Sequence, residues 1–380
     1  MNAALDPTAV PSGSASRSAH RALEHSLIRR VLAHLEARTT DADPAPSTLP
    51  VAAYRDDRDA FLFGQLPLAV GHASQVANVG DFFTHDASGL PLLVVRHDDG
   101  IHAFLNVCRH RGTRLEAAPC GAGKKAFICP YHAWSYGRDG AQLGAPHAYG
   151  FTGLGPRDLA RVPIAEVAGL LVIRPRPDWL GALAADLTSY GLAGGVAFAP
   201  RAVTRALSWQ LAVDVFLETY HLRTTHKDSI YPMFFDTVGL VDRVGPHLRN
   251  VFPKRSIREL ATQPEDTWQL RRHANVLFHL FPNTFVLVEP DHAAVLHVWP
   301  QGPAHTLLTS YMVVPEAPAT DKARAYWHAN NDILMNAVDE DFAMGESIQR
   351  GLASGANAEV VFGSFEHALE HFHRQVREIN

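Results

Sequence analysis

The spacing of apolar and polar positions changes twice along the chain. Between residues 21 and 38, apolar side chains recur at near-helical spacing, which predicts a helix packed by one face. From about 55 to 160, short apolar runs alternate with turns rich in Gly and Asp, which predicts a small antiparallel β domain. Further on, a helical stretch at 208–226 precedes strand-like runs and two more helical segments. The second half is therefore expected to be an antiparallel sheet covered by helices, and the fold class is α+β.

These changes of pattern divide the chain into four segments. Residues 1–20 are rich in small residues and are expected to form a disordered tail. Residues 21–50 are expected to form an N-terminal helix and a linker. Residues 51–165 are assigned to the β domain, and residues 166–380 to the α+β domain.

Composition argues against several classes of function. The net charge is −5 and no basic stripe occurs, so neither nucleic acid nor an anionic membrane is an expected partner. No apolar run approaches the ~20 residues of a membrane span, and the start of the chain lacks the apolar segment of a signal peptide. Three cysteines are too few for a disulfide framework, which favours a reducing cytoplasm.

Histidine is unusually frequent, with 22 copies, so each proposed ligand needs a spacing argument. The final helical segment shows why. His367 and His371 flank its apolar stripe, and we expect both to be surface groups and not ligands of a metal.

The first motif with a metal-ligand spacing is Cys108-x-His110, followed after 18 residues by Cys129-x-x-His132. Such a Cys2His2 set could hold a structural zinc ion, but zinc fingers place their cysteines together and their histidines together. Here each of two loops supplies one thiolate and one imidazole. Both cysteines can then hold one iron and both histidines the other, which is the ligation of a Rieske [2Fe–2S] cluster. Cys120, between the loops, is expected to be a spare thiol.

The second motif lies in "DVFLETYHLRTTH", which contains Asp214, Glu218, His221 and His226. If this stretch is helical, the first three share one face, and the helix must bend for His226 to reach the same ion. Two imidazoles and one carboxylate form the facial triad of non-haem Fe(II) oxygenases. The histidine pair alone would not identify a metal site, but its position after the Cys/His motif favours one.

The stretch "CRHRG…CPYHAW" resembles the Rieske signature of ring-hydroxylating oxygenase large subunits. The order of motifs over residues 50–375 is similar to that of Rieske non-haem iron oxygenases. The resemblance implies a small all-β Rieske domain and a catalytic domain of START/Bet v1-like helix-grip fold. It also implies that His221 and His226 bind iron. A third ligand is expected within "VDEDFAMGESIQRG"; we choose Asp341, with Asp339 as the alternative.

The resemblance gives further residues a role. Glu218 stands where the family carries a bridging carboxylate that hydrogen-bonds one cluster histidine and one iron histidine. Glutamate at this position is similar to the carnitine- and betaine-type oxygenases. Asp214 stands one helical turn earlier, and both a catalytic and a structural role are open for it. Val215 and Leu222 are expected near the substrate pocket.

Together these features predict the terminal oxygenase component of a multicomponent Rieske oxygenase. Electrons from NAD(P)H would reach the [2Fe–2S] cluster and then a mononuclear Fe(II), where O2 is used to hydroxylate or oxidatively demethylate an organic substrate. The chain shows no dinucleotide or flavin fingerprint, so a separate NAD(P)H-dependent reductase is expected, with or without a ferredoxin. In the family, the cluster serves the iron of a neighbouring subunit, which implies a homotrimer; the low cysteine count favours a cytoplasmic location.

Three alternatives stay open. The first is an aromatic-ring cis-dihydroxylating dioxygenase α subunit with a separate β subunit. The second is a Rieske electron-transfer protein, against which the second motif argues. The third is a binding protein that has lost oxygenase chemistry, which the presence of His221, His226 and Asp341 argues against.

Overall fold

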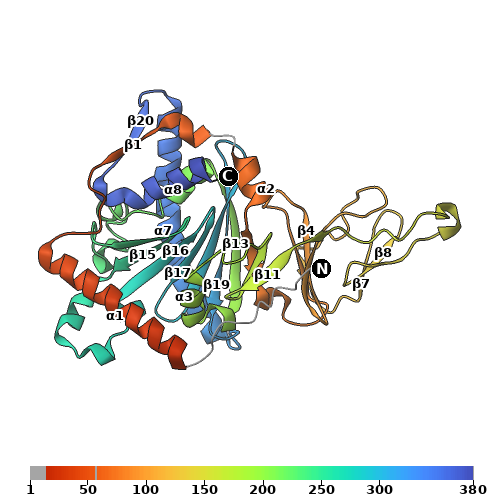
Figure 1. Ribbon diagram of the computed structural model, residues 1–380, viewed down its shortest axis with the longest axis horizontal. Coiled ribbons are helices and arrows are strands. Elements are labelled where there is room, and N and C mark those ends of the chain that lie inside the picture. Colours follow the sequence, from red (N-terminus) through yellow and green to blue (C-terminus); the bar gives the residue numbers. More distant parts are fainter. Residues whose placement is uncertain (1–13, 56–57, 380) are drawn as a thin grey trace. The chain divides into compact units, whose positions relative to one another are not determined.

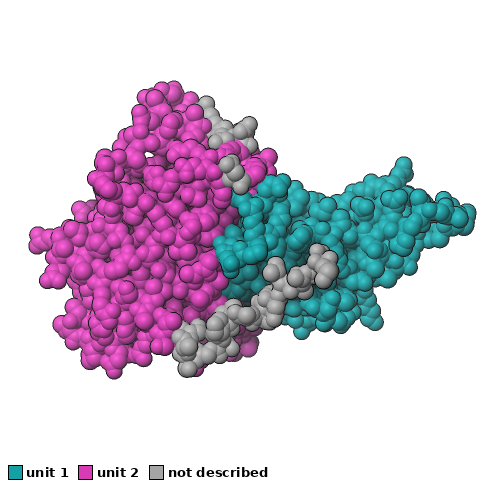
Figure 2. Space-filling view, in the orientation of Figure 1, with its two compact units in different colours: residues 1–9, 63–179 teal, residues 10–62, 180–380 magenta. Residues whose placement is uncertain are grey.

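The structure is a computed structural model that describes residues 14–55 and 58–379 of the chain (Figure 1). Their contacts define two compact units (Figure 2): unit 1 contains residues 63–179, and unit 2 contains the remaining described residues. The predicted domain limits at 50/51 and 165/166 stay predictions. Most of the predicted tail lies outside the described residues, and the first helix begins at Ser14, earlier than expected.

Unit 1 is built from short antiparallel strands. They are β2 (Leu68–His72), β3 (Phe82–His85), β4 (Leu92–His97), β5 (Gly100–Leu105), β6 (Cys120–Gly121), β7 (Ala126–Ile128), β8 (Ser135–Gly137), β9 (Gln142–Gly144), β10 (Arg161–Val162), β11 (Ile164–Val167) and β12 (Leu170–Ile173). They form a five-stranded sheet in the order β10-β5-β4-β3-β6 and two three-stranded sheets, β11-β12-β2 and β7-β8-β9. Phe82, Phe104 and Phe127 pack in a buried cluster with Cys108 and Cys129, so both cysteine-bearing loops are anchored in the core.

Unit 2 contains a seven-stranded antiparallel sheet in the order β13-β19-β18-β17-β16-β15-β14. Its strands are β13 (Val196–Arg205), β14 (Leu240–Val244), β15 (His247–Pro253), β16 (Ala274–Leu280), β17 (Thr284–Val288), β18 (Ala293–Pro300) and β19 (Thr306–Val314). Every residue of β16 and β17 is buried, as expected of central strands covered on both faces. Two short strands, β1 (Ser47–Pro50) and β20 (Glu359–Phe362), pair separately.

The helices of the described residues differ in length, and one of them, α2, spans the limit between the two units. They are α1 (Ser14–Ala37), α2 (Asp59–Gln65), α3 (Leu183–Ser189), α4 (Trp209–Asp214), α5 (Leu222–Thr225), α6 (Leu270–His273), α7 (Asp321–Ala353) and α8 (His367–Glu378). Within unit 2, α4 contacts β18, and α7 contacts β13, α4 and α5. The α+β class with a helix-covered antiparallel sheet is therefore confirmed. Within the described ranges, no helix combines the length and apolar character that a membrane crossing requires.

The predicted helix at 208–226 is interrupted, which corrects one expectation. Helix α4 ends at Asp214 and α5 begins at Leu222, so Asp214, Glu218 and His221 do not share one helical face. After Asp214 the backbone makes tight turns, and the N–H of Leu217 donates to the carbonyl of Asp214 over 3.0 Å. The Glu218 carboxylate then accepts the N–H of His221 over 3.1 Å, which satisfies a donor at the start of the next helix.

The histidines of α8 are buried, contrary to the sequence-based expectation. His367 and His371 are 7% and 4% exposed. The guanidinium of Arg243 lies 3.1 Å from Nδ1 of His367, and that of Arg374 lies 3.2 Å from Nδ1 of His371. The polar side of α8 is thus covered by arginines from other parts of the fold and from the helix itself, which a single apolar stripe does not reveal. Burial and the charge of Arg243 lower the pKa of His371 to about 4.

Another buried histidine, His279 of β16, ties the stability of unit 2 to pH. Its ring stacks on Phe285, and its Nε2 donates to the carbonyl of Pro282 over 3.0 Å. Burial lowers the pKa of His279 to about 3, so the ring stays neutral in the folded chain. An unfolded chain binds a proton at this ring near pH 6.5. Stability from this group is therefore complete above that pH and is lost as the pH falls toward 3, by ~1.4 kcal/mol per pH unit.

We predict that His279→Leu weakens the acid sensitivity of unit 2, because it removes one proton-binding difference between the folded and unfolded states. Apparent thermal unfolding midpoints, followed by far-ultraviolet circular dichroism at pH 7.5 and 5.5, should differ less in this variant than in the parent. His305→Leu, which replaces an exposed histidine, should keep the parental difference. Equal pH dependence in the parent and His279→Leu would contradict the prediction.

Candidate metal centres

Three side chains of unit 2 bring their ligand atoms to one point. His221 Nε2 and His226 Nε2 lie 3.2 Å apart, and Asp341 Oδ1 lies 3.2 Å from the first and 2.8 Å from the second. His226 is 1% and Asp341 7% exposed. Although both imidazole nitrogens are close to Asp341 Oδ1, this buried oxygen has no aligned hydrogen-bond partner among the described residues. Two imidazole nitrogens and one carboxylate oxygen in this arrangement fit a single Fe(II) ion.

The ligand-bearing elements are held together by contacts outside the triad. Asp341 lies on α7, and Gly345 lies one turn further along the same helix. A Cβ at Gly345 would lie 2.5 Å from Leu207 Cδ1, so a larger residue there would require the Leu207 side chain to shift. The Gln349 side chain accepts the N–H of Ser208 over 2.8 Å and thereby ties α7 to the start of α4.

The other nitrogen of each imidazole contacts a carboxylate. His221 Nδ1 contacts Glu218 Oε1, and His226 Nδ1 lies 2.6 Å from Glu340 Oε2. Such bonds place the ring proton on Nδ1 and leave Nε2 free for a metal. Ser229 Oγ donates to the same Glu340 oxygen over 2.7 Å. The sequence did not lead us to a role for Glu340. Its position directly before Asp341 was the feature from which a role at the metal site could have been inferred.

The carboxylates give the site a surplus of negative charge. Burial alone would lower the pKa of His221, but the nearby carboxylates of Asp341 and Glu218 outweigh it and raise this pKa to about 10. The pKa of His226 is also raised, since Asp341 and Glu340 outweigh the effect of burial. An environment that favours positive charge at these rings also favours a bound cation.

Two other predicted acids lie in different surroundings. Asp339 forms ion pairs with Arg201, at 3.1 Å, and with Arg205. Asp214 accepts a hydrogen bond from Tyr54 Oη over 2.6 Å and lies 2.8 Å from His373 Nε2. It therefore joins α4 to α8 in a buried polar cluster, and its catalytic role stays a prediction.

A cavity of about 370 Å³ lies beside the triad, and all three triad residues line it. Helix α7 lines one side with residues three or four positions apart, as expected of one helical face. They are Tyr326, Asn330, Ile333, Leu334, Ala337, Val338 and Asp341. The sheet contributes Phe252, Leu277 and Leu287, and Val215 and Leu222 line the cavity as predicted.

The four residues of the first motif lie in unit 1. Cys108 and Cys129 are buried and free of disulfide bonds. His110 Nδ1 and His132 Nδ1 lie 3.1 Å apart. Two thiols and two converging imidazoles are the donor set of a Rieske cluster, so these residues fit the group. Cys120 is exposed and is the first residue of β6.

Aromatic side chains support these loops. The Trp134 ring is stacked on His110 with an interplanar angle of 4°. Tyr136 Oη lies 3.4 Å from Cys108 Sγ and accepts the N–H of Arg109 over 3.0 Å. Ala133 adopts a φ of 57°, in the left-handed region that favours glycine, and its N–H donates to the Cys129 carbonyl over 3.0 Å. The second loop is therefore a tight turn directly after its cysteine.

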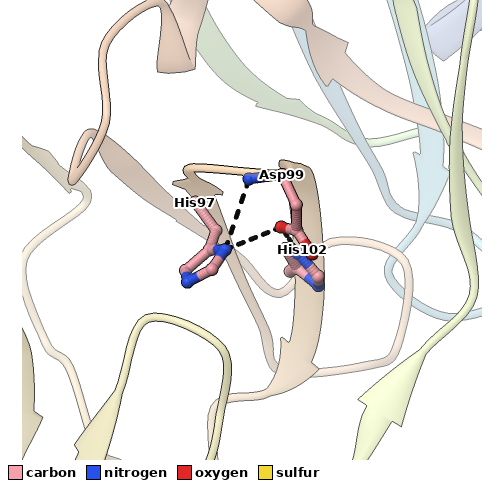
Figure 3. Close-up of side chains that lie close together, drawn as sticks. All are labelled: His97, Asp99 and His102. Carbon is pink, nitrogen blue, oxygen red and sulfur yellow. Dashed lines mark hydrogen bonds and ion pairs between the residues drawn. The ribbon is translucent and has the colours of Figure 1, made fainter.

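A further group of metal-type side chains lies on the β4–β5 hairpin of unit 1 (Figure 3). Asp99 Oδ1 lies 2.6 Å from both His97 Nδ1 and His102 Nε2. Arg161 Nη1 lies 2.7 Å from His102 Nδ1. A guanidinium can only donate, so this Nδ1 accepts and the ring proton of a neutral His102 sits on Nε2, facing Asp99. Nε2 of His102 therefore carries a proton and has no lone pair for a metal. The three side chains and Arg161 instead form a network of hydrogen bonds among themselves.

Two family models match the chain. The Rieske [2Fe-2S] domain matches residues 67–154, and the catalytic domain of the ring hydroxylating alpha subunit matches residues 197–380. Choline monooxygenase of Beta vulgaris is 28% identical over 364 residues, which cover 89% of this chain and 77% of the relative. The carnitine monooxygenase oxygenase subunit of Escherichia coli K12 is 27% identical over 368 residues, which cover 89% and 95%.

Solved structures share the fold. A quaternary ammonium Rieske monooxygenase in complex with L-carnitine matches with a TM-score of 0.73 at 21% identity, over 87% of this chain and 94% of that one. Naphthalene 1,2-dioxygenase from Rhodococcus sp. matches with a TM-score of 0.69 at 18% identity, over 93% and 97%. The chain therefore belongs to the alpha subunits of the Rieske ring-hydroxylating oxygenases, and it is a terminal oxygenase whose cofactors are a [2Fe–2S] cluster and a mononuclear iron.

Proposed function

We propose that this terminal oxygenase is a monooxygenase that inserts one oxygen atom into a C–H bond of a small alkylamine or quaternary ammonium compound. The observation that carries the proposal is the mainly apolar cavity of about 370 Å³ whose wall includes His221, His226 and Asp341. This size suits a small molecule. The names of relatives give the substrate class further support, since they refer to choline, carnitine, glycine betaine and putrescine.

We assign the iron to His221 Nε2, His226 Nε2 and a carboxylate oxygen of Asp341. When bound, the iron supplies the binding and reductive activation of O2, with electrons that arrive through the cluster. Glu218 and Glu340 hold the two imidazoles in the orientation that directs Nε2 toward the metal. The apolar walls, which include Leu222 and Val338, exclude water from the reacting carbon.

We assign the cluster to Cys108 and Cys129 on one iron and to His110 and His132, through Nδ1, on the other. The chain works with a separate electron-transfer partner. For that partner we propose an NAD(P)H-dependent reductase, with or without a ferredoxin. For the assembly we propose a homotrimer in which Glu218 bridges His221 to a cluster histidine of the neighbouring subunit.

Aromatic-ring cis-dihydroxylation is the competing activity, and product mass separates the two. The purified oxygenase, supplied with a surrogate reductase and NADH, is screened against alkylamines, quaternary ammonium compounds and aromatic hydrocarbons under 18O2. We expect substrate-dependent oxygen uptake and incorporation of one labelled oxygen atom into an amine. Two labelled atoms on adjacent ring carbons, with no amine oxidised, would overturn the proposal.

The cluster assignment predicts the fate of each cysteine. The parent should be red-brown and contain about two acid-labile sulfides per chain. Cys108→Ala or Cys129→Ala should remove both colour and sulfide, because each removes a thiolate ligand. Cys120→Ala, at an exposed position, is the matched control and should keep both. A parent protein that contains zinc and no sulfide would refute the assignment.

The iron assignment predicts variants that lose the mononuclear iron and activity but keep the cluster. His221→Ala, His226→Ala or Asp341→Ala should keep the absorbance of the cluster and lower product formation by roughly 100-fold or more, because even residues that only orient a ligand affect metal sites 10–100-fold. Iron per chain, measured by plasma emission spectroscopy, should fall by the share of the mononuclear site. Asp339→Ala breaks only the pairs with Arg201 and Arg205 and should retain that iron. The reverse result for the two aspartates would move the third ligand to Asp339.

Glu218 is predicted to act in electron transfer as well as in holding His221. Glu218→Gln should keep the cluster and most of the mononuclear iron but slow oxidation of the pre-reduced cluster in a single turnover with substrate and O2. Glu218→Asp, which restores a carboxylate, should recover part of that rate. Glu340→Gln is the control, since Glu340 orients the other imidazole and is not proposed to bridge subunits. An unchanged oxidation rate in Glu218→Gln would leave this residue with a positioning role only.

A further inference from the structure

The carboxylate of Asp214 is held by side chains from two distant segments of unit 2. Tyr54 Oη donates to Asp214 Oδ2 over 2.6 Å, and His373 Nε2 lies 2.8 Å from Oδ1 and 3.0 Å from Oδ2. All three side chains are buried, and Asp214 is 7% exposed. Asp214 therefore connects the end of α4 to the turn Val51–Arg55 and to α8. We name Tyr54, Asp214 and His373 the Asp214 clamp.

Aromatic neighbours fix the imidazole of this clamp. The His373 ring stacks on Phe362, with ring centroids 5.9 Å apart and an interplanar angle of 15°. The Tyr54 ring meets the same imidazole edge-on, with centroids 5.0 Å apart. A donor that packing already holds in place loses little freedom when it binds its acceptor. The clamp is therefore a rigid connection, which suits it to set the position of another segment.

The clamp lies at the start of the segment that carries Glu218 and His221. Asp214 is the last residue of α4, and its carbonyl accepts the N–H of Leu217 over 3.0 Å. Leu217 is buried and directly precedes Glu218, whose carboxylate accepts the N–H of His221. Turns replace the helix between Asp214 and His221, so a continuous ladder of helical hydrogen bonds does not hold this path. Its course depends on the contacts at its ends.

The residues just before α8 reach the same segment. The Phe365 ring contacts that of Tyr220, with centroids 5.1 Å apart. Burial raises the pKa of Glu366, and the negative charges of Glu218 and Asp214 raise it further, against the effect of a hydrogen bond from a backbone N–H. Glu366 is thus within electrostatic reach of both carboxylates. The C-terminal segment therefore supports the clamp and also the residue that holds His221.

The position of Asp214 argues against direct contact with the reacting atoms. Among the described residues that line the cavity are Val215 and Phe216, and not Asp214. Both oxygens of Asp214 face the donors of the clamp, so they are engaged before any metal or substrate binds. Asp214 can therefore influence the triad only through the segment that it anchors.

We propose that Asp214 is a positioning residue, which fixes the turns after α4 so that the Glu218 carboxylate meets Nδ1 of His221. Without the negative charge of Asp214, Tyr54 and His373 lose their common acceptor, and the end of α4 loses its link to α8. The Glu218 carboxylate then takes up more than one position, and His221 loses the bond that directs its Nε2 toward the metal. This role rests on the proposed iron assignment and does not depend on the substrate class.

Hydrogen–deuterium exchange of the holoenzyme, followed by mass spectrometry, tests whether the clamp fixes the backbone. Asp214→Asn loses the charge, and Tyr54→Phe loses one hydroxyl and decides the test where the first variant does not fold. We expect peptides that cover 215–222 to exchange roughly 10-fold faster in both, the effect of one hydrogen bond, while β17 keeps the parental rate. Asp186→Asn, at a similarly buried aspartate paired with Arg249, is the matched control and should not affect 215–222 selectively. Parental exchange at 215–222, or equal acceleration throughout unit 2, would overturn the proposal.

Nitric oxide then tests whether the ligands move. With the cluster oxidised, the electron paramagnetic resonance spectrum of the Fe(II)–nitric oxide complex reports the arrangement of the iron ligands. We expect a changed spectrum in Asp214→Asn and His373→Leu, a nearly parental one in His373→Gln, whose amide N–H can replace the imidazole donor, and a parental one in Asp186→Asn. A parental spectrum in Asp214→Asn would refute the positioning role. A parent that forms no such complex would sink the iron assignment instead, and the exchange result would then decide whether Asp214 fixes the turns.

Discussion

The organisation of unit 2 depends on the contact between the Glu218 carboxylate and His221. One oxygen accepts the backbone N–H of His221, and the other contacts its Nδ1. The first bond starts α5 after the turns that follow α4, and the second sets the tautomer of the ring. Without the interruption, His221 and His226 would be five positions apart on a continuous helix and would point in different directions. The Glu218 carboxylate thus stabilises the backbone at the start of α5 and also orients the imidazole of His221.

Helix α7 supplies both a predicted metal ligand and one wall of the cavity. The face of α7 that lines the cavity carries Asp341 at the triad and Tyr326 fifteen residues earlier, with Asn330 and apolar residues between them. The hydrogen bond from Ser208 N–H to Gln349 joins the ligand end of α7 to the start of α4.

The features that the sequence could indicate are local ones. The two Cys/His loops and the pair His221–His226 are encoded within a few residues, and the choice of Asp341 agrees with its place 2.8 Å from His226. Features that depend on distant partners were missed. The contact of buried His367 depends on Arg243 of the distant strand β14, and the role of Glu340 follows from the position of His226. Nothing in the residues around Asp214 shows that Tyr54 and His373 contact it.

Two His/Asp groups among the described residues show what separates a metal site from a polar network. Both bring two imidazoles and one carboxylate within reach of one another. On the hairpin of unit 1, Arg161 donates to His102 Nδ1, which directs the ring proton toward Asp99 and removes the lone pair on that side. In unit 2, carboxylates accept from the outer nitrogens of both rings, so the proton is drawn outward and both Nε2 atoms face the shared Asp341 oxygen. The difference lies in the charge of the group that contacts the outer nitrogen of the ring. A cation such as Arg161 donates to that nitrogen, so the ring proton lies on the inner nitrogen, where a metal would bind. A carboxylate accepts the ring proton at the outer nitrogen, so the lone pair of the inner nitrogen remains available for a metal.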